Sequence, residues 1–571
     1  MNFRKIFLAF VLVVLVVLAP LSYAFAAAAD PVRAPHAMVA STSPIASEVG
    51  VEIMRKGGNA VDAAVAVGFA LAVTWPSAGN LGGGGFLLYR AAEGESEIVD
   101  YRERAPLAAS RDMYLDDEGR VIESLSTDGY LASGVPGTVA GLALAHQRHG
   151  KLPWKDLLEP ARRLAADGFI VPQHLARSLS VDRTFRRLSK FPESRRIFLR
   201  DGKLREAGER FVQPELAETL RRIQAEGPED FYRGETARRI VADMAANGGN
   251  ITARDLAEYE PTIRQPLFAR YRGVEVMTVP PPSSGGIAIL QMLAMLEKHD
   301  LAAMGYGSAD SVHLLIEVMK RAFADRAAHL GDADFARVPL RGLVARAYAA
   351  SLGASIDPER ATPSRLVSAG DPAPYESPET THFTVVDPAG NIVANTYTLN
   401  DSYGSAVTVK GTGILLNDEM DDFTSRPGTS NLYGLVQGEA NAIEPRKRPL
   451  SSMTPTIVLR EGKPWFALGS PGGPTIINSV LQVIVNVVDF GMDMQQAVAA
   501  PRVHHQWLPD EIRWEPYGIS PDTRRLLERR GHLFRERPGE MGDVQAIMIA
   551  PRSGLRLGGS DPRLGGVAVG Y

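Results

Sequence analysis

The 571-residue sequence contains no cysteine, which excludes disulfide bonds, thiolate metal ligands and cysteine nucleophiles. It also lacks the Gly-x-Ser-x-Gly motif of serine hydrolases and the His-Glu-x-x-His motif of zinc proteases. The glycine run at residues 82–85 is not followed by Gly-Lys-Ser/Thr, so we expect it to permit a close backbone approach rather than to bind phosphate. His504 and His505 are adjacent, but neighbouring residues on a strand face opposite ways, so a shared metal site is not expected.

Excess charge of one sign is also absent, since 62 Lys and Arg stand against 66 Asp and Glu. Nothing in this balance indicates a nucleic-acid surface. Long apolar runs are scarce: the one at residues 6–18 is shorter than the roughly 20 residues of a membrane-spanning helix. Arg4 and Lys5 precede this run and a small-residue stretch, residues 24–27, follows it, which is the order of a secretory signal peptide.

We therefore predict a signal peptide over residues 1–26 and export to the periplasm or out of the cell. An uncleaved membrane anchor is the alternative. No later segment has a comparable apolar run, so no membrane contact is expected once the signal is removed.

The chain then reads as mainly helical up to about residue 352. Serines 41, 43 and 47 are candidate N-caps for one helix, and a second helix is predicted over residues 60–73. Two strands are predicted at residues 86–90 and 97–102. Residues 154–352 have a helical pattern, interrupted at residues 274–286.

Composition changes at residues 353–379, which hold five prolines among scattered serines and acidic residues. This segment is predicted to form neither a helix nor an interior strand, and to be exposed and mobile. Strands follow it. Residues 381–387 and 391–398 flank one turn, residues 454–459 and 465–468 flank another, and residues 545–550 form a further strand. Paired strands after a long helical stretch predict layered α and β structure rather than alternating βαβ units.

The transition between these parts falls at Glu379 and Thr380, where the proline-rich segment ends and a strand begins. If the bond between them is cleaved, Thr380 becomes a chain terminus. Its own α-amine, with a pKa of about 7.7–8, can then act as a base for its hydroxyl. On this pattern alone, a purely structural threonine at the start of a strand is the alternative reading.

Six segments together resemble the γ-glutamyltransferase family, in the same order and over nearly all of the chain after the leader. They are residues 56–64, 79–85, 281–286, 417–423, 448–453 and 469–473. The resemblance implies an α+β fold, the four-layer αββα sandwich of the N-terminal-nucleophile hydrolases, built from both halves of a cleaved precursor. It further implies a large subunit of residues 27–379, with a flexible C-terminal segment 353–379, and a small catalytic subunit of residues 380–571.

The resemblance also implies the catalytic residues. Thr380 would attack the γ-carbonyl of the substrate and carry the γ-glutamyl ester, and Thr398 would hydrogen-bond Thr380 and orient it. The backbone N–H groups of Gly472 and Gly473, which precede a predicted helix, would form an oxyanion hole.

Ligand-binding residues are implied in the same way. Asp422, with Glu419 and Asn400, would bind the ammonium of the glutamyl group. Arg102, whose planar fork suits a carboxylate, would bind the carboxylate together with Ser451 and Ser452. Residues 431–441 resemble the lid loop of the transferases, in which Tyr433 would shield the acyl-enzyme, and this loop favours a γ-glutamyl over a glutaryl substrate.

The implied function is that of a γ-glutamyltransferase and glutathione hydrolase. Glutathione and other γ-glutamyl compounds would be donors, and water, amino acids or dipeptides would be acceptors. The enzyme would be a heterodimer of its own two cleaved chains, and no metal or organic cofactor is implied. Two alternatives remain: a glutaryl-type cephalosporin acylase, and a non-catalytic periplasmic protein that binds γ-glutamyl peptides.

Overall fold

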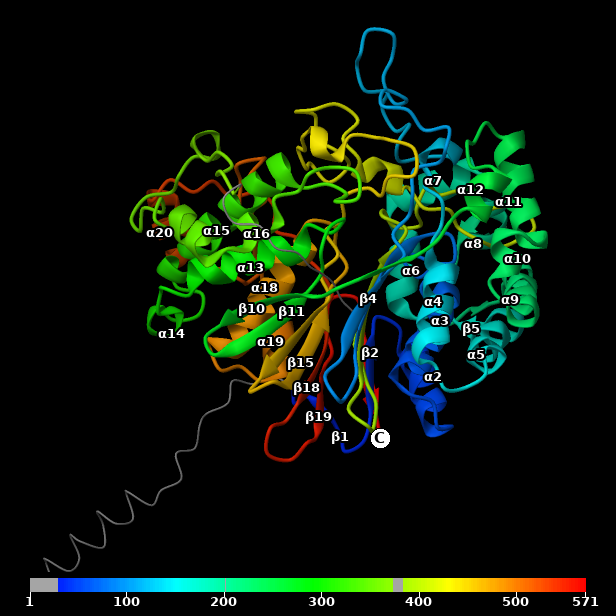
Figure 1. Ribbon diagram of the computed structural model, residues 1–571, viewed down its shortest axis with the longest axis horizontal. Helices are drawn as coiled ribbons and strands as arrows, with labels where there is room; N and C mark the ends of the chain where they lie inside the picture. The colour runs from blue at the N-terminus through cyan, green and yellow to red at the C-terminus, as the bar shows by residue number, and fades with distance from the viewer. Residues whose placement is uncertain (1–28, 201, 373–383) are drawn as a thin grey trace, which may run out of the picture. The chain divides into compact units, whose positions relative to one another are not determined.

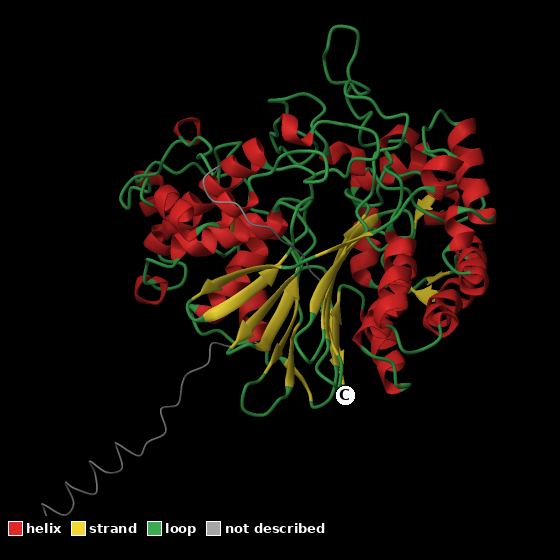
Figure 2. Cartoon of the chain, in the orientation of Figure 1, coloured by secondary structure: helices red, strands yellow, loops and turns green. Residues whose placement is uncertain are grey.

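The computed structural model describes residues 29–200, 202–372 and 384–571. The expected signal peptide, Glu379 and Thr380 lie outside these ranges. Residues 31–571 form one unit, whose centre is a pair of seven-stranded antiparallel sheets with helices on both sides (Figure 1). Figure 2 shows the two sheets together in the middle and the helices in two groups outside them.

The first sheet combines strands from both ends of the chain. In spatial order they are β1 (Val32–Ala34), β19 (Arg556–Gly559), β18 (Gln545–Ile549), β15 (Lys463–Gly469), β14 (Thr456–Arg460), β11 (Val274–Thr278) and β10 (Leu267–Tyr271). The second sheet is similarly mixed. Its order is β20 (Val567–Gly570), β2 (Met38–Ser41), β12 (Val385–Val386), β13 (Ile392–Thr398), β3 (Gly84–Arg90), β4 (Ser96–Asp100) and β9 (Thr262–Arg264). Each sheet therefore contains strands from before and after position 380.

Strand β3 shows how the layers form. Phe86 and Leu88 are buried in the core that includes residues of the first sheet, while Leu87 and Tyr89 belong to the core shared with the helices of the N-terminal half. Because side chains alternate along a strand, each strand of this kind contributes to two cores. The result is helix, sheet, sheet, helix, which confirms the expected α+β sandwich.

Helices of the N-terminal half pack on the outer side of the second sheet or further out. They are α2 (Pro44–Arg55), α3 (Ala60–Thr74), α4 (Thr138–His149), α5 (Trp154–Asp167), α6 (Gln173–Ser180), α7 (Asp182–Lys190), α8 (Pro192–Phe198), α9 (Pro214–Glu226), α10 (Glu229–Tyr232), α11 (Glu235–Ala246) and α12 (Ala253–Ala257). The helices beside the first sheet are α13 (Gly285–Leu296), α14 (Leu301–Met304), α15 (Ala309–His329), α16 (Leu340–Val344), α17 (Arg346–Gly353), α18 (Thr475–Val488), α19 (Met494–Ala499) and α20 (Pro521–Arg529). In the described part of the chain, no helix combines the length and the apolarity needed to cross a membrane.

The structure shows which residues cap the first two predicted helices. Of the three candidate serines, Ser43 caps α2, where its side chain accepts from the N–H of Ala46 and Pro44 occupies the first turn. Asn59 caps α3 in a capping box with Asp62. Every residue of α3 is buried, because this apolar helix lies between the second sheet and outer helices.

The prediction that residues 353–379 are exposed holds for half of the described residues 353–372, but four of these residues are buried: Ala361, Ser364, Val367 and Pro372. Carboxylates of α15 hold this segment: Glu317 accepts from the N–H of Thr362 at 3.1 Å, and Asp325 accepts from the N–H of Gly370 at 3.0 Å. Ser364 is fully buried, and its N–H donates to a third carboxylate. No α-helix or strand forms over residues 354–372, where the only regular element is one turn of 3-10 helix, Ser364–Leu366. Side-chain carboxylates accept hydrogen bonds from the backbone instead, which composition alone does not reveal.

Candidate active site

A cavity of about 470 Å³ collects residues that are far apart in the sequence. Nine of the residues predicted for the site line it: Arg102, Thr398, Asn400, Asp422, Tyr433, Ser451, Ser452, Gly472 and Gly473. Glu419 is not among the lining residues. Glu379 and Thr380 lie outside the described residues, so the structure does not place them.

Strand direction explains part of this convergence. Strands β4 and β13 both pair antiparallel with β3, so they run in the same direction and end at the same edge of the sheet. Arg102 follows β4, and Thr398 is the last residue of β13. The glycine run permits this packing, because a Cβ on Gly83 would lie 2.0 Å from the carbonyl oxygen of Thr398. This confirms the close backbone approach predicted for residues 82–85.

Arg102 is fully buried and is held on three sides. Its Nη2 lies 2.6 Å from Oδ2 of Asp422, its Nη1 lies 2.5 Å from Oε2 of Glu419, and its Nε donates to the carbonyl of Pro449 at 3.2 Å. Glu419 is fully buried and absent from the cavity wall. The structure therefore places Glu419 against Arg102, and not among the residues that line the cavity.

The carboxyl groups around Arg102 are difficult to ionise. Burial raises the pKa of Glu419 well above its usual range, although Arg102 acts in the opposite direction. Burial likewise raises the pKa of Glu103 to about 8, and it also raises the pKa of Asp422. The charge of Arg102 lowers both pKa values but does not offset the effect of burial. The cluster thus holds less negative charge at neutral pH than its composition implies.

Thr398 and Asn400 are fixed by backbone contacts. The Asn400 N–H donates to Oγ1 of Thr398 at 3.0 Å, so the hydroxyl hydrogen of Thr398 points away from this bond. Asn400 has a φ of 78°, in the left-handed region that asparagine tolerates better than most residues. Its side-chain amide donates to the carbonyl of Asp418 at 3.0 Å. Thr398 can therefore offer a hydroxyl donor to a neighbouring group.

Gly472 and Gly473 connect β15 to α18 in a conformation that favours glycine, with φ values of 130° and 56°. The carbonyl of Gly472 accepts from both the N–H and the hydroxyl of Thr475, at 3.2 and 2.8 Å. The turn therefore lies at the N-terminus of a 14-residue helix, where the helix dipole favours negative charge. A loop of this kind can stabilise an oxyanion through its backbone N–H groups.

Ser451 and Ser452 are held by the segment that contains Ser283 and Ser284. Ser283 and Ser451 form an isolated parallel bridge, in which the Ser451 N–H donates to the carbonyl of Pro282 at 2.7 Å. The hydroxyl of Ser284 donates to the carbonyl of Ser451 at 2.6 Å. Residues 281–286, one of the six segments that resemble the family, thus support Ser451 and Ser452 at the cavity wall. The sequence analysis gave this segment no role.

The loop at residues 431–441 contacts the cavity from outside. The Tyr433 hydroxyl donates to the carbonyl of Asn400 at 2.7 Å, and Gln506 donates to the carbonyl of Tyr433 at 3.0 Å. The side chain of Gln437 donates to the carbonyl of Asp422 at 3.0 Å. The predicted lid residue therefore lines the cavity and is held by hydrogen bonds to Asn400 and Gln506.

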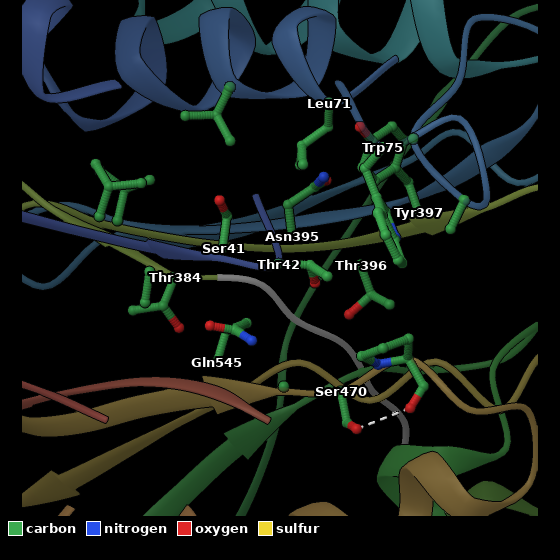
Figure 3. Close-up of a pocket in the computed structure, with 18 residues that line it drawn as sticks. Ser41, Thr42, Leu71, Trp75, Thr384, Asn395, Thr396, Tyr397, Ser470 and Gln545 are labelled. Atoms are coloured by element: carbon green, nitrogen blue, oxygen red, sulfur yellow. Dashed lines mark hydrogen bonds between the residues drawn. The ribbon is translucent and has the colours of Figure 1, made fainter. Parts of the chain in front are cut away.

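A second cavity of about 90 Å³ adjoins the first and shares five lining residues with it: Trp75, Ala78, Thr396, Tyr397 and Pro471. Figure 3 shows that its polar wall contains Ser41, Thr42, Asn395, Ser470 and Gln545, with Thr384 beside them. Thr384 is the first described residue after position 380.

The histidine pair has separate partners. Nδ1 of His504 accepts from the side-chain amide of Asn478 at 2.7 Å, whereas Nε2 of His505 lies 3.3 Å from Oδ1 of Asp510. Burial lowers the pKa of His504 to about 3. Within the described ranges, no group of three or more His, Asp and Glu side chains is arranged to hold a metal ion.

Comparison with known proteins settles the relationship. The family model described as gamma-glutamyltranspeptidase matches residues 46–571. The chain belongs to the gamma-glutamyltranspeptidase family. It is 50% identical over 533 residues to the glutathione hydrolase proenzyme of Escherichia coli strain K12, covering 93% of this chain and 91% of that one.

Acylases are related to this gamma-glutamyltranspeptidase family member as well. The acylase ACY 1 proenzyme of Pseudomonas sp. strain SE83 is 39% identical over 527 residues, with 91% of each chain covered. The crystal structure of cephalosporin acylase from Bacillus halodurans superposes with a TM-score of 0.82 at 28% identity, covering 97% of this chain and 99% of that one.

Sequence reasoning missed one buried residue of the gamma-glutamyltranspeptidase site. Arg326, on α15, contacts Ser284, Gln437 and Ser452. Nothing in its local sequence distinguishes it from other charged residues of that helix, because its burial depends on loops that are distant in the chain.

Proposed function

We propose that this chain is a γ-glutamyltransferase and glutathione hydrolase that cleaves itself before Thr380 and then uses Thr380 as its nucleophile. The observation that carries the proposal is the meeting of Arg102, Asp422, Thr398 and the Gly472–Gly473 turn around one cavity. These groups supply a carboxylate binder, an ammonium binder, a hydroxyl donor and an oxyanion site. The 50% identity to a glutathione hydrolase supports the same activity.

The position of Thr398 supports a nucleophile that its hydroxyl orients. Strand β13 pairs with β3 along its whole length, and Thr398 is its last residue. Thr398 also lines the cavity. A nucleophile that accepts a hydrogen bond from Thr398 would therefore face the substrate.

The proposed reaction has two steps. The α-amine of Thr380 takes the proton of its own hydroxyl, and Oγ attacks the γ-carbonyl of the donor. The N–H groups of Gly472 and Gly473 stabilise the oxyanion until the C–N bond breaks and the leaving amine takes the proton. Water or the amine of an acceptor then attacks the γ-glutamyl ester of Thr380, which releases glutamate or a new γ-glutamyl amide.

Substrate binding uses both charges of the glutamyl group. Arg102, Ser451 and Ser452 bind its carboxylate, and Asp422 with Asn400 binds its ammonium. Glu419 contributes by holding Arg102, from which its carboxyl lies 2.5 Å away. Tyr433 covers the acyl-enzyme.

We further propose that residues 1–26 are removed on export to the periplasm. Cleavage before Thr380 would give chains of residues 27–379 and 380–571. The name proenzyme carried by both curated relatives agrees with such processing. The two chains would stay together as a heterodimer, because both sheets contain strands from each of them.

A glutaryl acylase is the second candidate, favoured by the similarity to acylases. A glutaryl group has no ammonium, so Asp422 at the cavity wall would have no positive charge of the ligand to bind. Asp422 and the lid residue Tyr433 therefore favour a γ-glutamyl donor.

Intact mass spectrometry combined with kinetics tests the proposal. Wild-type protein should show two chains that begin near residue 27 and at Thr380, and it should hydrolyse γ-glutamyl-p-nitroanilide much faster than glutaryl-p-nitroanilide. Thr380→Ala should remain one chain without turnover, whereas Thr380→Ser should still cleave. Thr398→Ala should cleave to some degree and lose most of its turnover. Turnover by the Thr380→Ala variant would refute the assignment, and faster turnover of the glutaryl substrate would favour the acylase.

A further inference from the structure

Arg326 is a fully buried arginine without a carboxylate partner among the described residues. It is 2% exposed, and no Asp or Glu of that set lies within 4.0 Å of its guanidinium. Other fully buried arginines are paired: Arg102 with Asp422 and Arg502 with Asp561, both at 2.6 Å. Burying an unpaired charge is costly, so the polar groups that solvate Arg326 must be held in place.

The guanidinium contacts three separate segments. Nε donates to Oγ of Ser284 at 2.9 Å, Nη1 donates to Oε1 of Gln437 at 3.2 Å, and Nη2 donates to Oγ of Ser452 at 3.4 Å. Gln437 belongs to the lid loop, and Ser452 lines the cavity. Arg326 itself is absent from the cavity wall, so it can act on a ligand only through these neighbours.

The contact with Ser452 sets the direction of a hydrogen bond. A guanidinium only donates, so Oγ of Ser452 must accept from Arg326. The hydroxyl hydrogen of Ser452 then points away from Arg326, and Ser452 lines the cavity. A hydroxyl that accepts from a cation is also a stronger donor. Ser452 is thereby prepared to donate to an anionic group.

The contact with Ser284 fixes the neighbouring serine. Ser284 accepts from Arg326 and donates through the same hydroxyl to the carbonyl of Ser451 at 2.6 Å. One guanidinium thus supports both serines of the proposed carboxylate subsite.

Charge adds to this orientation. Burial lowers the pKa of Arg326 to about 10, partly opposed by Asp422, so the side chain remains protonated at neutral pH. Arg102 supplies a second guanidinium at the same cavity, while burial raises the pKa of Glu419 and Glu103. Arg326 therefore places a positive charge next to Ser452, which favours an anionic ligand group there.

We infer that Arg326 is a positioning residue that, through Ser452, makes the site select acyl donors with an α-carboxylate next to the α-ammonium. The inference rests on the proposed γ-glutamyl transfer, because it specifies how that donor is recognised. It assigns to α15 a part in specificity, although no residue of α15 lines the cavity.

The test compares two donors: γ-glutamyl-p-nitroanilide and the same anilide with its α-carboxylate converted to a carboxamide. The measured quantity is the ratio of the two kcat/KM values, taken on protein that gels show to be cleaved into two chains. We expect Arg326→Gln to lower this preference for the carboxylate about tenfold, mainly through KM of the carboxylate donor. Arg326→Lys keeps the charge but not the fork, so it should lie between this variant and wild type.

Arg321→Lys is the matched control. Arg321 is buried on the same helix, is paired with Glu317 at 2.8 Å, and does not line the cavity, so its substitution should leave the ratio unchanged. Ser452→Ala should lower the preference by itself, and adding Arg326→Gln to it should have little further effect.

An unchanged ratio in cleaved Arg326→Gln would overturn the inference, as would full additivity with Ser452→Ala. If Arg326→Gln does not cleave, Arg326→Lys decides by the same ratio. Failure of the proposed function is a separate result, because wild-type protein would then show no turnover of γ-glutamyl-p-nitroanilide.

Discussion

Arg102 and Asp422 form an ion pair in which Nη2 lies 2.6 Å from Oδ2. These are the two residues proposed to bind the carboxylate and the ammonium of the ligand. A ligand that carries both charges would exchange one pair within the protein for two pairs with the ligand. The site is therefore suited to a zwitterionic head group better than to a simple anion.

Substitution of Arg102 by lysine tests this arrangement. Arg102→Lys keeps the charge but loses the planar fork, which serves Asp422, Glu419 and the carbonyl of Pro449. We expect KM for a γ-glutamyl anilide to rise by roughly tenfold or more, and cleavage into two chains to continue. Steady-state kinetics on the cleaved variant provide the measurement. An unchanged KM would remove Arg102 from the site.

Substitution of Gly473 tests the oxyanion turn. Gly473→Ala imposes a side chain at a φ of 56° and places its Cβ 2.9 Å from the ring of Tyr433. The turn must shift, so we expect kcat to fall by about 100-fold, in the range seen when one oxyanion donor is lost. Gly428→Ala is the control, because its φ is 80° but no atom lies within 4 Å of the added Cβ. Equal kcat losses in both variants would point to backbone strain alone.

The role of Tyr433 in the lid loop can be tested by removing its hydroxyl oxygen. Tyr433→Phe removes the 2.7 Å hydrogen bond to the carbonyl of Asn400 and keeps the ring that packs on Gly473. One such bond contributes about 0.5–1.5 kcal/mol, so kcat/KM should fall by roughly two- to tenfold. Kinetics with the anilide, with and without an acceptor dipeptide, will show whether hydrolysis and transfer are affected equally. A wild-type profile would mean that this bond does not hold the lid.

Glu103 makes stability depend on pH. Burial raises its pKa from the ordinary value of 4.5 to about 8. Between these values the folded protein holds a proton that the unfolded chain releases, so stability falls as pH rises through this window. Glu103→Gln cannot titrate, and we expect its Tm relative to wild type to be higher at pH 9 than at pH 5. Thermal unfolding at the two pH values measures this, and a constant Tm difference would contradict it.

The outline of the fold could be predicted because β-forming residues and the turn residues that flank them can be recognised in short stretches of sequence. Residues 391–398 and 465–468 were predicted as strands from such signals; the first range matches β13 except for residue 391, and the second lies within β15. Nine residues of the cavity wall followed from the family resemblance. The positions of Glu419 and Arg326 could not be predicted in this way, because each depends on which distant loop covers the side chain. The same holds for Ser364, which is buried and whose N–H donates to Asp510, far away in the sequence.

Because the two sheets interleave strands from both chains, folding before cleavage differs from refolding after cleavage. Pairs such as β1 with β19, β11 with β14 and β2 with β12 join strands from opposite sides of position 380. While the chain is intact, these pairs form within one molecule at a rate that does not depend on concentration. After cleavage, an unfolded molecule would have to find its second chain by diffusion, and dilute protein would be lost to aggregation or proteolysis first. The two chains would then assemble only in the uncleaved precursor, and a mature enzyme that unfolds would not refold.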